Sequence, residues 1–231
     1  MKPFNLSSRL FTTVFWQGIL QNTDQWRSEL AALSDALKRL DDLRTAADYN
    51  TGSISNSAAW CLYSLARYFQ PLHVIEIGTF IGKSTWALAQ GMDDHQGGPG
   101  DIFTCDLSNN IKVPWTGKTK LVQFPKTSST EMLKRLSGIH DLCFLDGRVG
   151  DEDLKRLDSL IDQNTIIVLD DFEGMEKGVA NLKNLKTMPK LANHFLIYPA
   201  SENYLQELGF TSHSTVAVML PLSRVALSNQ G

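Results

Sequence analysis

Hydrophobic and polar positions follow two different patterns along the chain, and the first pattern has the periodicity of a helix. The segment WRSELAALSDALKRLDDLRTAA, residues 26–47, carries leucines at helical spacing with charged residues between them. These leucines are Leu30, Leu33, Leu37, Leu40 and Leu43. After the polar break DYNTGSISNS, the segment SAAWCLYSLARYF predicts a second amphipathic helix that Ser55 or Ser57 could cap. The leucine stripe indicates packing on the chain's own domain, with a partner surface as the alternative.

From Leu72 onward the pattern changes to short apolar runs that predict strands. These runs are residues 72–78, 102–107, 119–124, 141–147, 164–171, 194–199 and 214–220. Amphipathic segments between them predict helices at residues 82–92, 129–138, 151–161 and 201–210. Short apolar strands that alternate with helices predict an α/β fold, in which helices cover both faces of a mostly parallel sheet.

The composition narrows the class of protein. The chain has 231 residues, of which 42% are hydrophobic and 20% charged, as expected for one soluble globular domain. The net charge of -3 argues against a general nucleic-acid binder, because neutralising phosphates requires clustered Lys and Arg. No apolar run approaches ~20 residues, so we expect no membrane span. The separated cysteines Cys61, Cys105 and Cys143 indicate reduced, buried thiols in a cytoplasmic protein.

The first two predicted strands end in residues that suit a ligand. In sheets of this class, ligands bind beyond the carboxyl ends of the strands, near the point where the strand order reverses. The first strand runs into EIGTFIGKST, where Gly78 and Gly82 let the backbone approach a ligand at the start of a helix. This spacing differs from the GxGxxG of dinucleotide folds. The second strand ends in Asp106, which either accepts ribose hydroxyls or forms a turn ahead of Ser108 and Asn109.

Carboxylates end the fourth and fifth predicted strands. Asp146 follows the fourth strand, and Asp170 and Asp171 follow the fifth. If these strands are neighbours, three like charges meet at one edge of the sheet and raise each other's pKa values. A hard divalent cation such as Mg²⁺ would remove the repulsion, because it prefers oxygen ligands. The alternative is that Asp171 caps a turn and Asp146 belongs to an Asp-Gly turn.

The order of these motifs resembles a known enzyme family. EIGTFIGKST, CDLS, CFLDG and VLDDFEG are similar to the class I S-adenosylmethionine-dependent methyltransferases. More narrowly, they resemble the metal-dependent O-methyltransferases, which include catechol O-methyltransferase and enzymes that modify macrolide and aminocoumarin sugars. The resemblance implies a Rossmann-like, seven-stranded, mostly parallel sheet with an antiparallel last strand. It also implies a cofactor-binding domain over residues 51–231 and an N-terminal helical extension over residues 1–50, which would form a lid or dimer contacts.

The resemblance also implies roles for individual residues. The glycine turn would hold the methionine part of S-adenosylmethionine, Asp106 its ribose, and the segment after the third strand its adenine. The implied cofactor-binding residues are Glu76, Gly78, Thr79, Phe80, Gly82, Ser84, Asp106, Thr127, Ser128 and Ser129. The implied ligands of Mg²⁺, or of another hard divalent cation, are Asp146, Asp170 and Asp171. A metal that binds two neighbouring hydroxyls would position them and lower their pKa values.

The candidate catalytic residues are Asp146, Arg148 and Asp151, and here the chain departs from the family. Its relatives place a Lys, His or Asp shortly after the ligand that ends the fourth strand, but Arg148 stays protonated and suits an anionic substrate group better. Asp151 opens a predicted helix, so a capping role competes with catalysis. We expect His213 to lie far from the site. Glu173 and Lys177 follow the predicted metal ligands Asp170 and Asp171 along the chain and could reach the site. Either the metal suffices, the base comes from elsewhere, or activity has been lost.

The residues therefore favour a metal-dependent O-methyltransferase that acts on a small molecule with adjacent oxygens. The alternative is a catalytically silent cofactor-binding protein whose N-terminal helices bind a partner. A nicotinamide-dependent oxidoreductase is disfavoured, because the GxGxxG pattern is missing. The expected partners are a small-molecule substrate and a second copy of the chain bound through the N-terminal helices, with no nucleic acid and no membrane.

Overall fold

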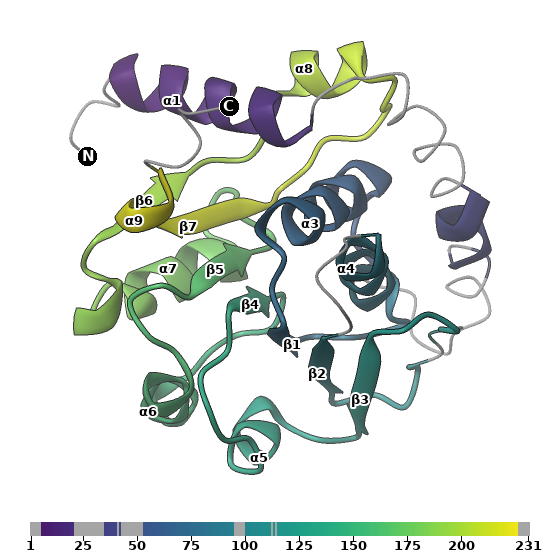
Figure 1. Ribbon diagram of the computed structural model, residues 1–231, viewed down its shortest axis with the longest axis vertical. Coiled ribbons are helices and arrows are strands. Elements are labelled where there is room, and N and C mark those ends of the chain that lie inside the picture. Colours follow the sequence, from purple (N-terminus) through teal and green to yellow (C-terminus); the bar gives the residue numbers. More distant parts are fainter. Residues whose placement is uncertain are drawn as a thin grey trace.

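A computed structural model describes residues 6–20, 35–40, 42, 53–94, 100–111, 113 and 115–225 of the chain. Residues 35–40 are helical, and Leu37 and Leu40 are buried there, as the leucine stripe predicts. Leu30, Leu33 and Leu43 lie outside the described residues. The remaining described residues build a sheet with helices on both faces (Figure 1).

The sheet has seven strands in the order β3-β2-β1-β4-β5-β7-β6. The strands are β1 (His73–Ile77), β2 (Asp101–Asp106), β3 (Lys120–Pro125), β4 (Leu142–Leu145), β5 (Ile166–Leu169), β6 (His194–Ile197) and β7 (Ala217–Pro221). Strands β1 to β5 pair in parallel, and β7 is antiparallel to both β5 and β6. This confirms the predicted Rossmann-like sheet with an antiparallel last strand. Each predicted apolar run overlaps one strand.

Helices cover the two faces of the sheet and bury a separate core on each side. The described helices are α1 (Leu6–Ile19), α3 (Asn56–Phe69), α4 (Lys83–Asp93), α5 (Ser129–Leu133), α6 (Asp151–Leu160), α7 (Lys177–Leu185), η1 (Pro189–Leu191), α8 (Glu202–Glu207) and α9 (Leu222–Val225). Figure 1 shows α3 and α4 on one face and α5 and α6 on the other. Residues of α1, α3 and α4 belong to one core cluster, and residues of α5, α6 and α7 belong to the other. The covered faces explain why β4, β5 and β7 consist of apolar residues alone.

The N-terminal helix α1 packs on the sheet edge formed by β6. The ring of Phe11 lies edge-on to that of Phe195 at 4.7 Å, and the indole of Trp16 donates a hydrogen bond of 2.7 Å to the carbonyl of Tyr198. Trp16 and Leu20 are buried in the same cluster as α3. This part of the extension therefore packs on its own domain, whereas a division of the chain at residue 50 stays a prediction.

Two details of the sequence interpretation were confirmed. Ser55 caps α3, because its hydroxyl accepts the N–H of Ala58 at 3.0 Å. Cys61, Cys105 and Cys143 are free and buried. Among the described residues, no helix has the length and apolar character needed to cross a membrane.

The strand register brings the predicted site residues to one edge of the sheet. Ile77 pairs with Cys105 on one side and with Leu145 on the other, and Leu145 pairs with Leu169. The next residues along these four strands are Gly78, Asp106, Asp146 and Asp170. The strand order reverses between β1 and β4, so this edge is also the switch point where open α/β sheets bind ligands.

Candidate active site

Two pockets open at the carboxyl edge of the sheet. The larger pocket, of about 810 Å³, is lined by Gly78, Asp106, Thr127 and Arg148 among others. The smaller pocket, of about 200 Å³, lies between the ends of β4, β5 and β7 and the segment before α3. Asp146 lines both pockets. The carboxylate of Asp146 would therefore contact a ligand in either pocket.

The glycine turn after β1 depends on glycine at two positions. Gly78 has φ +103°, and a Cβ there would lie 3.1 Å from the backbone carbon of Asp146. Gly82 has φ +91° and caps α4, and a Cβ there would overlap the side chain of Val113. Larger residues at either position would be strained and would collide. Phe80 lines the larger pocket, and Thr79, Phe80 and Ser84 border a recess beside it.

Glu76 lies beneath the glycine turn, outside the lining of the described pockets. Its Oε2 accepts hydrogen bonds from the hydroxyls of Thr104, at 2.6 Å, and Thr85. Burial raises the pKa of Glu76, against hydrogen bonds from the hydroxyls of Ser84, Thr104 and Thr85. Through Oε2 the carboxyl group thus joins β1, β2 and α4 under the turn, while Oε1 is buried without a hydrogen-bond partner among the described residues. Its role in cofactor binding stays a prediction.

Asp106 lies where β2 ends and lines the larger pocket. Its Oδ2 accepts the N–H of Phe80 at 2.8 Å, and its Oδ1 accepts the N–H of Ser108 at 2.7 Å. These bonds fix the carboxylate while leaving each oxygen a further lone pair for a hydroxyl. The turn-forming role and the ligand-binding role of Asp106 are therefore compatible.

Thr127, Ser128 and Ser129 line the far part of the larger pocket, at the start of α5. Ser128 caps this helix, and Glu131 completes a capping box with it. The N–H of Thr127 donates to the carbonyl of Asp106 at 3.0 Å, which ties this segment to the end of β2. Both sides of the larger pocket are thus held by backbone hydrogen bonds.

The three predicted metal ligands meet at the smaller pocket. Asp146, Asp170 and Asp171 all line it. Asp170 is buried and accepts the hydroxyl of Thr215 at 2.7 Å. Asp171 has φ +48°, a left-handed conformation that Asp tolerates better than most residues. The sequence prediction of adjacent carboxylates was therefore confirmed for the strand ends themselves.

Lys177, the first residue of α7, lies between two of these carboxylates. Its Nζ is 2.6 Å from Oδ1 of Asp146 and 3.0 Å from Oδ2 of Asp171. Gly178 makes this placement possible, because a Cβ there would lie 2.1 Å from the carbonyl oxygen of Asp170. Without a side chain at residue 178, the N-terminus of α7 presses against the end of β5. The sequence named Lys177 only as a residue that could reach the site, and its contacts with Asp146 and Asp171 are what the structure adds.

The charges of this cluster shift each other's pKa values. Burial raises the pKa of Asp146 well above its ordinary range, the neighbouring Asp170 adds to this, and Lys177 opposes it. Burial also raises the pKa of Asp170, against the hydrogen bond from Thr215. Burial lowers the pKa of Lys177, but the carboxylates of Asp146 and Asp171 outweigh it and raise this pKa above the usual range of lysine. One ammonium thus partly neutralises a buried group of like charges.

As arranged, the three aspartates do not fit a divalent cation. The Lys177 ammonium lies where an ion shared by Asp146 and Asp171 would be, and Asp170 is engaged by Thr215. Within the described part of the chain, no three His, Cys, Asp or Glu side chains are grouped to hold one metal ion. This arrangement gives no support to the predicted metal site, which stays a prediction.

The loop after β4 carries Arg148 and is held from α7. Asn181 accepts the N–H of Val149 at 2.9 Å and donates to the carbonyl of Gly147 at 2.8 Å. Arg148, between these two residues, is exposed and lines the larger pocket. Asp151 is the first residue of α6, and its exposed side chain lies outside the lining of both pockets. The N-cap of α6 is Gly150, so the interpretation of Asp151 as the capping residue was wrong.

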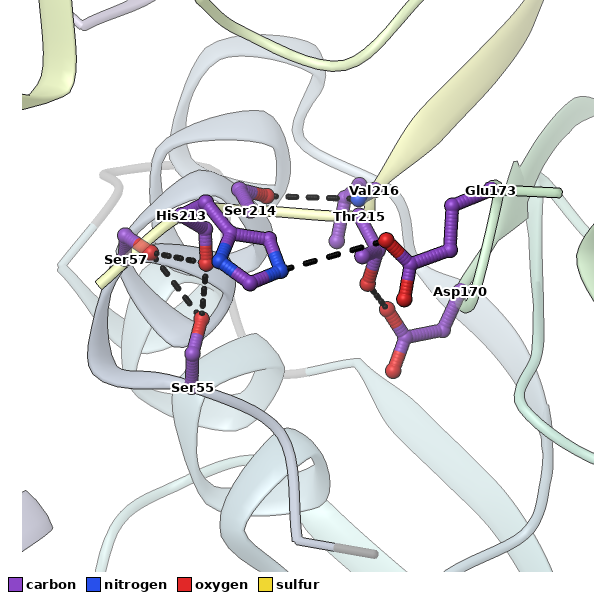
Figure 2. Close-up of polar contacts among 8 residues, drawn as sticks. All are labelled: Ser55, Ser57, Asp170, Glu173, His213, Ser214, Thr215 and Val216. Atoms are coloured by element: carbon purple, nitrogen blue, oxygen red, sulfur yellow. Dashed lines mark hydrogen bonds and ion pairs between the residues drawn. The ribbon is translucent and has the colours of Figure 1, made fainter. Parts of the chain in front are cut away.

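His213 lies in the smaller pocket, so the expectation that it is remote from the site was wrong. Figure 2 shows its imidazole facing the carboxylate of Glu173, with Nε2 4.0 Å from Oε2. The hydroxyls of Ser55 and Ser57 each donate to its backbone carbonyl at 2.8 Å. These contacts join the segment before β7 to the start of α3, more than 150 residues earlier in the chain. No local pattern could have indicated them.

One family of known domains matches the chain. Residues 75–172, from β1 to just after β5, match the family described as a methyltransferase domain. This span includes the glycine turn, Asp106 and the three aspartates at the ends of β4 and β5. No curated protein sequence matches the chain.

Solved structures of low sequence identity share the fold. The O-methyltransferase TomG from Streptomyces achromogenes, solved in complex with SAM, is 17% identical, with 94% of this chain and 99% of that chain covered and a TM-score of 0.57. A putative O-methyltransferase from Klebsiella pneumoniae is 15% identical over 80% of this chain and 89% of that chain, with a TM-score of 0.58. The O-methyltransferase from Bacillus cereus, in complex with SAH, is 14% identical over 92% of this chain and 98% of that chain, with a TM-score of 0.52.

The family match and the shared architecture agree with each other. The glycine turn after β1 and the strands β2 to β5 lie within the matched span, whereas the antiparallel β7 lies beyond it. Residues 75–172 therefore match a methyltransferase domain, and the chain shares its fold with solved O-methyltransferases.

Proposed function

We propose that the chain transfers a methyl group from S-adenosylmethionine to a hydroxyl oxygen of a small molecule. The observation that carries this proposal is the pair of pockets that share Asp146. The larger pocket, of about 810 Å³, is within the usual size range of ligand sites. The smaller pocket, of about 200 Å³, suits the reacting end of an acceptor.

The larger pocket fits S-adenosylmethionine by the chemistry of its walls. The turn at Gly78 brings backbone close to the pocket, Asp106 offers carboxylate oxygens for ribose hydroxyls, and Thr127 to Ser129 border the opposite end for the adenine. When bound, S-adenosylmethionine would supply a methyl group attached to a positively charged sulfur. The acceptor oxygen would form a bond to the methyl carbon while the carbon–sulfur bond breaks and its electron pair stays on sulfur. The carboxylate of Asp146 borders both pockets and favours positive charge between them.

The smaller pocket supplies a group that can take the proton of the acceptor. His213 lines this pocket, and an imidazole is suited to accept a proton near neutral pH. Glu173 faces its Nε2, and the serine hydroxyls hold its backbone. We assign to His213 the role of general base, which leaves the acceptor oxygen free to attack. Arg148 lines the larger pocket and not the smaller one, so its role as an anchor for an anionic substrate group stays a prediction.

Calorimetry tests the cofactor site. Titrating S-adenosylhomocysteine into the full chain should give binding of one molecule per chain. Asp106→Ala should weaken this binding by about 1–3 kcal/mol, because it removes a charged hydrogen-bond acceptor. The matched control is Asp158→Ala, which removes an exposed carboxylate near the other end of α6 and should bind as tightly as the unchanged chain. If the unchanged chain does not bind, the proposal is wrong.

Turnover separates an enzyme from the silent binding module. Incubation with S-adenosylmethionine and a panel of phenols, catechols, sugars and hydroxy acids should give a methyl ether and S-adenosylhomocysteine in equal amounts, measured by mass spectrometry. His213→Gln should lower kcat by ~100-fold with little change in cofactor affinity, the usual size of a general-base contribution. Cofactor binding with no transfer to any of these acceptors would favour the silent module.

Three further properties stay predictions beside this proposal. Dependence on Mg²⁺ or another divalent cation gains no support from the arrangement of Asp146, Asp170 and Asp171. A cytoplasmic location and a homo-oligomer formed through the N-terminal helices are likewise predictions from the sequence alone.

A further inference from the structure

Lys177 occupies an unusual place for a cation. It is the first residue of α7, and the N-terminus of a helix carries partial positive charge that favours anions. Its side chain is only 26% exposed, so it also gives up much of its hydration. A lysine in this position is stable only when negative groups face it, and Asp146 and Asp171 do so.

The position of the ammonium is set by the backbone around it. Gly178 lets α7 begin against the carbonyl of Asp170, where any larger residue would collide. Asn181, one turn further along α7, is bonded to both Gly147 and Val149 in the loop after β4. The helix that carries Lys177 is thus fixed to the ends of the two strands that supply its partners.

The ammonium and a divalent cation would compete for the same place. A hard divalent cation needs carboxylate oxygens within about 2.0–2.6 Å of a single point. The Nζ of Lys177 lies 2.6 Å from Oδ1 of Asp146 and 3.0 Å from Oδ2 of Asp171, so it takes up the point between them. Two positive ions cannot share it, because their repulsion in a partly buried site is large.

We propose that the Lys177 ammonium takes the place of a catalytic metal ion, and that methyl transfer by this chain therefore needs no divalent cation. This inference rests on the proposed function as far as methyl transfer is concerned. It changes the expected substrate class, since a metal would select acceptors with two adjacent oxygens. With Lys177 in that place, an acceptor needs only one hydroxyl within reach of His213.

Binding of Mn²⁺, followed by electron paramagnetic resonance of the free ion, tests this inference without any turnover. The unchanged chain should leave Mn²⁺ free, with or without S-adenosylhomocysteine. Lys177→Met removes the charge at similar length and should gain one bound Mn²⁺ per chain. Lys177→Arg keeps the charge and should leave the ion free, as should the control Lys183→Met on the exposed side of α7.

Two results would overturn the inference. The first is that the unchanged chain binds one Mn²⁺ and the Asp170→Asn chain does not. This result needs no lysine variant and would support the predicted metal site. The second is a Lys177→Met chain that is folded by circular dichroism and still leaves Mn²⁺ free. Binding of S-adenosylhomocysteine is measured in the same samples, so failure of the cofactor site is seen separately from failure of the lysine proposal.

Discussion

Asp146 borders both pockets and faces both like and opposite charge. Burial and Asp170 favour its neutral form, while Lys177 favours its charged form. The distance of 2.6 Å to the lysine ammonium is that of a charge-assisted hydrogen bond. The protonation state of Asp146 therefore depends on whether a cation, either the lysine ammonium or a metal ion, lies beside it.

The buried carboxyl group of Glu76 predicts a pH dependence of stability. Because burial raises its folded-state pKa, the folded chain holds the proton more tightly than the unfolded chain. Its contribution is most favourable below the ordinary value of 4.5 and is lost as the pH rises through the raised value. Glu76→Gln should therefore gain stability relative to the unchanged chain as the pH rises across this window.

Urea unfolding of the two chains at a series of pH values between 4 and 8 measures the difference. The matched control is Glu207→Gln at an exposed position of α8, for which the difference should stay flat. A constant difference between Glu76→Gln and the unchanged chain would contradict a raised pKa of Glu76.

Gly178 predicts a contrast between two glycines in helices. Gly178→Ala should destabilise the chain by about 1–3 kcal/mol, because the new Cβ meets the carbonyl of Asp170 in a packed site. Gly18→Ala in α1 meets no atom within 4 Å and should stabilise by up to about 1 kcal/mol through helix propensity. Thermal unfolding of both variants gives the comparison, and equal effects would mean that the close approach of α7 is absent.

At the scale of residues, the sequence predicted those site groups whose positions follow from strand ends. Asp106, Asp146 and Asp170 were predictable because an acidic residue directly follows an apolar run. Lys177 could be named only from its closeness to Asp170 and Asp171 along the chain, because its contact with Asp146 depends on where α7 begins. His213 was not predictable, because its position depends on hydrogen bonds to Ser55 and Ser57 from the other end of the chain.

The element that organises the site is α7. It supplies Lys177 to the carboxylates, and it holds the loop that carries Arg148 through Asn181 and Asn184. Asn181 is almost completely buried, whereas Asn184 is partly exposed and makes one bond of 3.1 Å to the carbonyl of Val149. The two asparagines therefore differ in how much they stabilise this loop.

Asn181→Ala should cost about 1–3 kcal/mol of unfolding free energy, because it leaves the N–H of Val149 and the carbonyl of Gly147 without partners. It should also weaken binding of S-adenosylhomocysteine, since the loop lines the larger pocket. Asn184→Ala is the control and should have a clearly smaller effect on both quantities. Urea unfolding and calorimetry measure them, and equal losses in the two variants would contradict the role given to Asn181.

The described elements also show where sequence patterns succeed. All seven strands were predicted from short apolar runs, and the runs are wholly apolar in β4, β5 and β7, which are buried throughout. The short η1 and α9 were missed, and so was α7, whose buried face includes Gly178 and Asn181 beside two leucines. Their formation depends on tertiary contacts with the strands, which a local pattern does not carry.

At the scale of the whole molecule, the parallel sheet places all the chemistry at one edge. The order β3-β2-β1-β4-β5 puts the glycine turn in the centre, Asp106 on one side and the aspartate cluster on the other. Cofactor binding at this edge joins β1, β2 and β4, so it should stabilise the fold as a unit. With S-adenosylhomocysteine at about 100 times its Kd, the unfolding free energy should rise by about 2.7 kcal/mol.

Thermal unfolding with and without S-adenosylhomocysteine measures this gain, and Asp106→Ala should reduce it at the same ligand concentration. Adenosine serves as the comparison ligand, because it lacks the amino acid part that the glycine turn would hold. An equal stabilisation by both ligands would contradict a role of the turn in binding.

A crystal structure of the chain with S-adenosylhomocysteine, grown in magnesium-containing buffer, tests the central claim most directly. The account predicts ribose hydroxyls on Asp106, adenine beside Thr127 to Ser129, and the Lys177 ammonium still between Asp146 and Asp171. Cofactor bound outside the larger pocket, or a magnesium ion on the aspartates with Lys177 turned away, would contradict it.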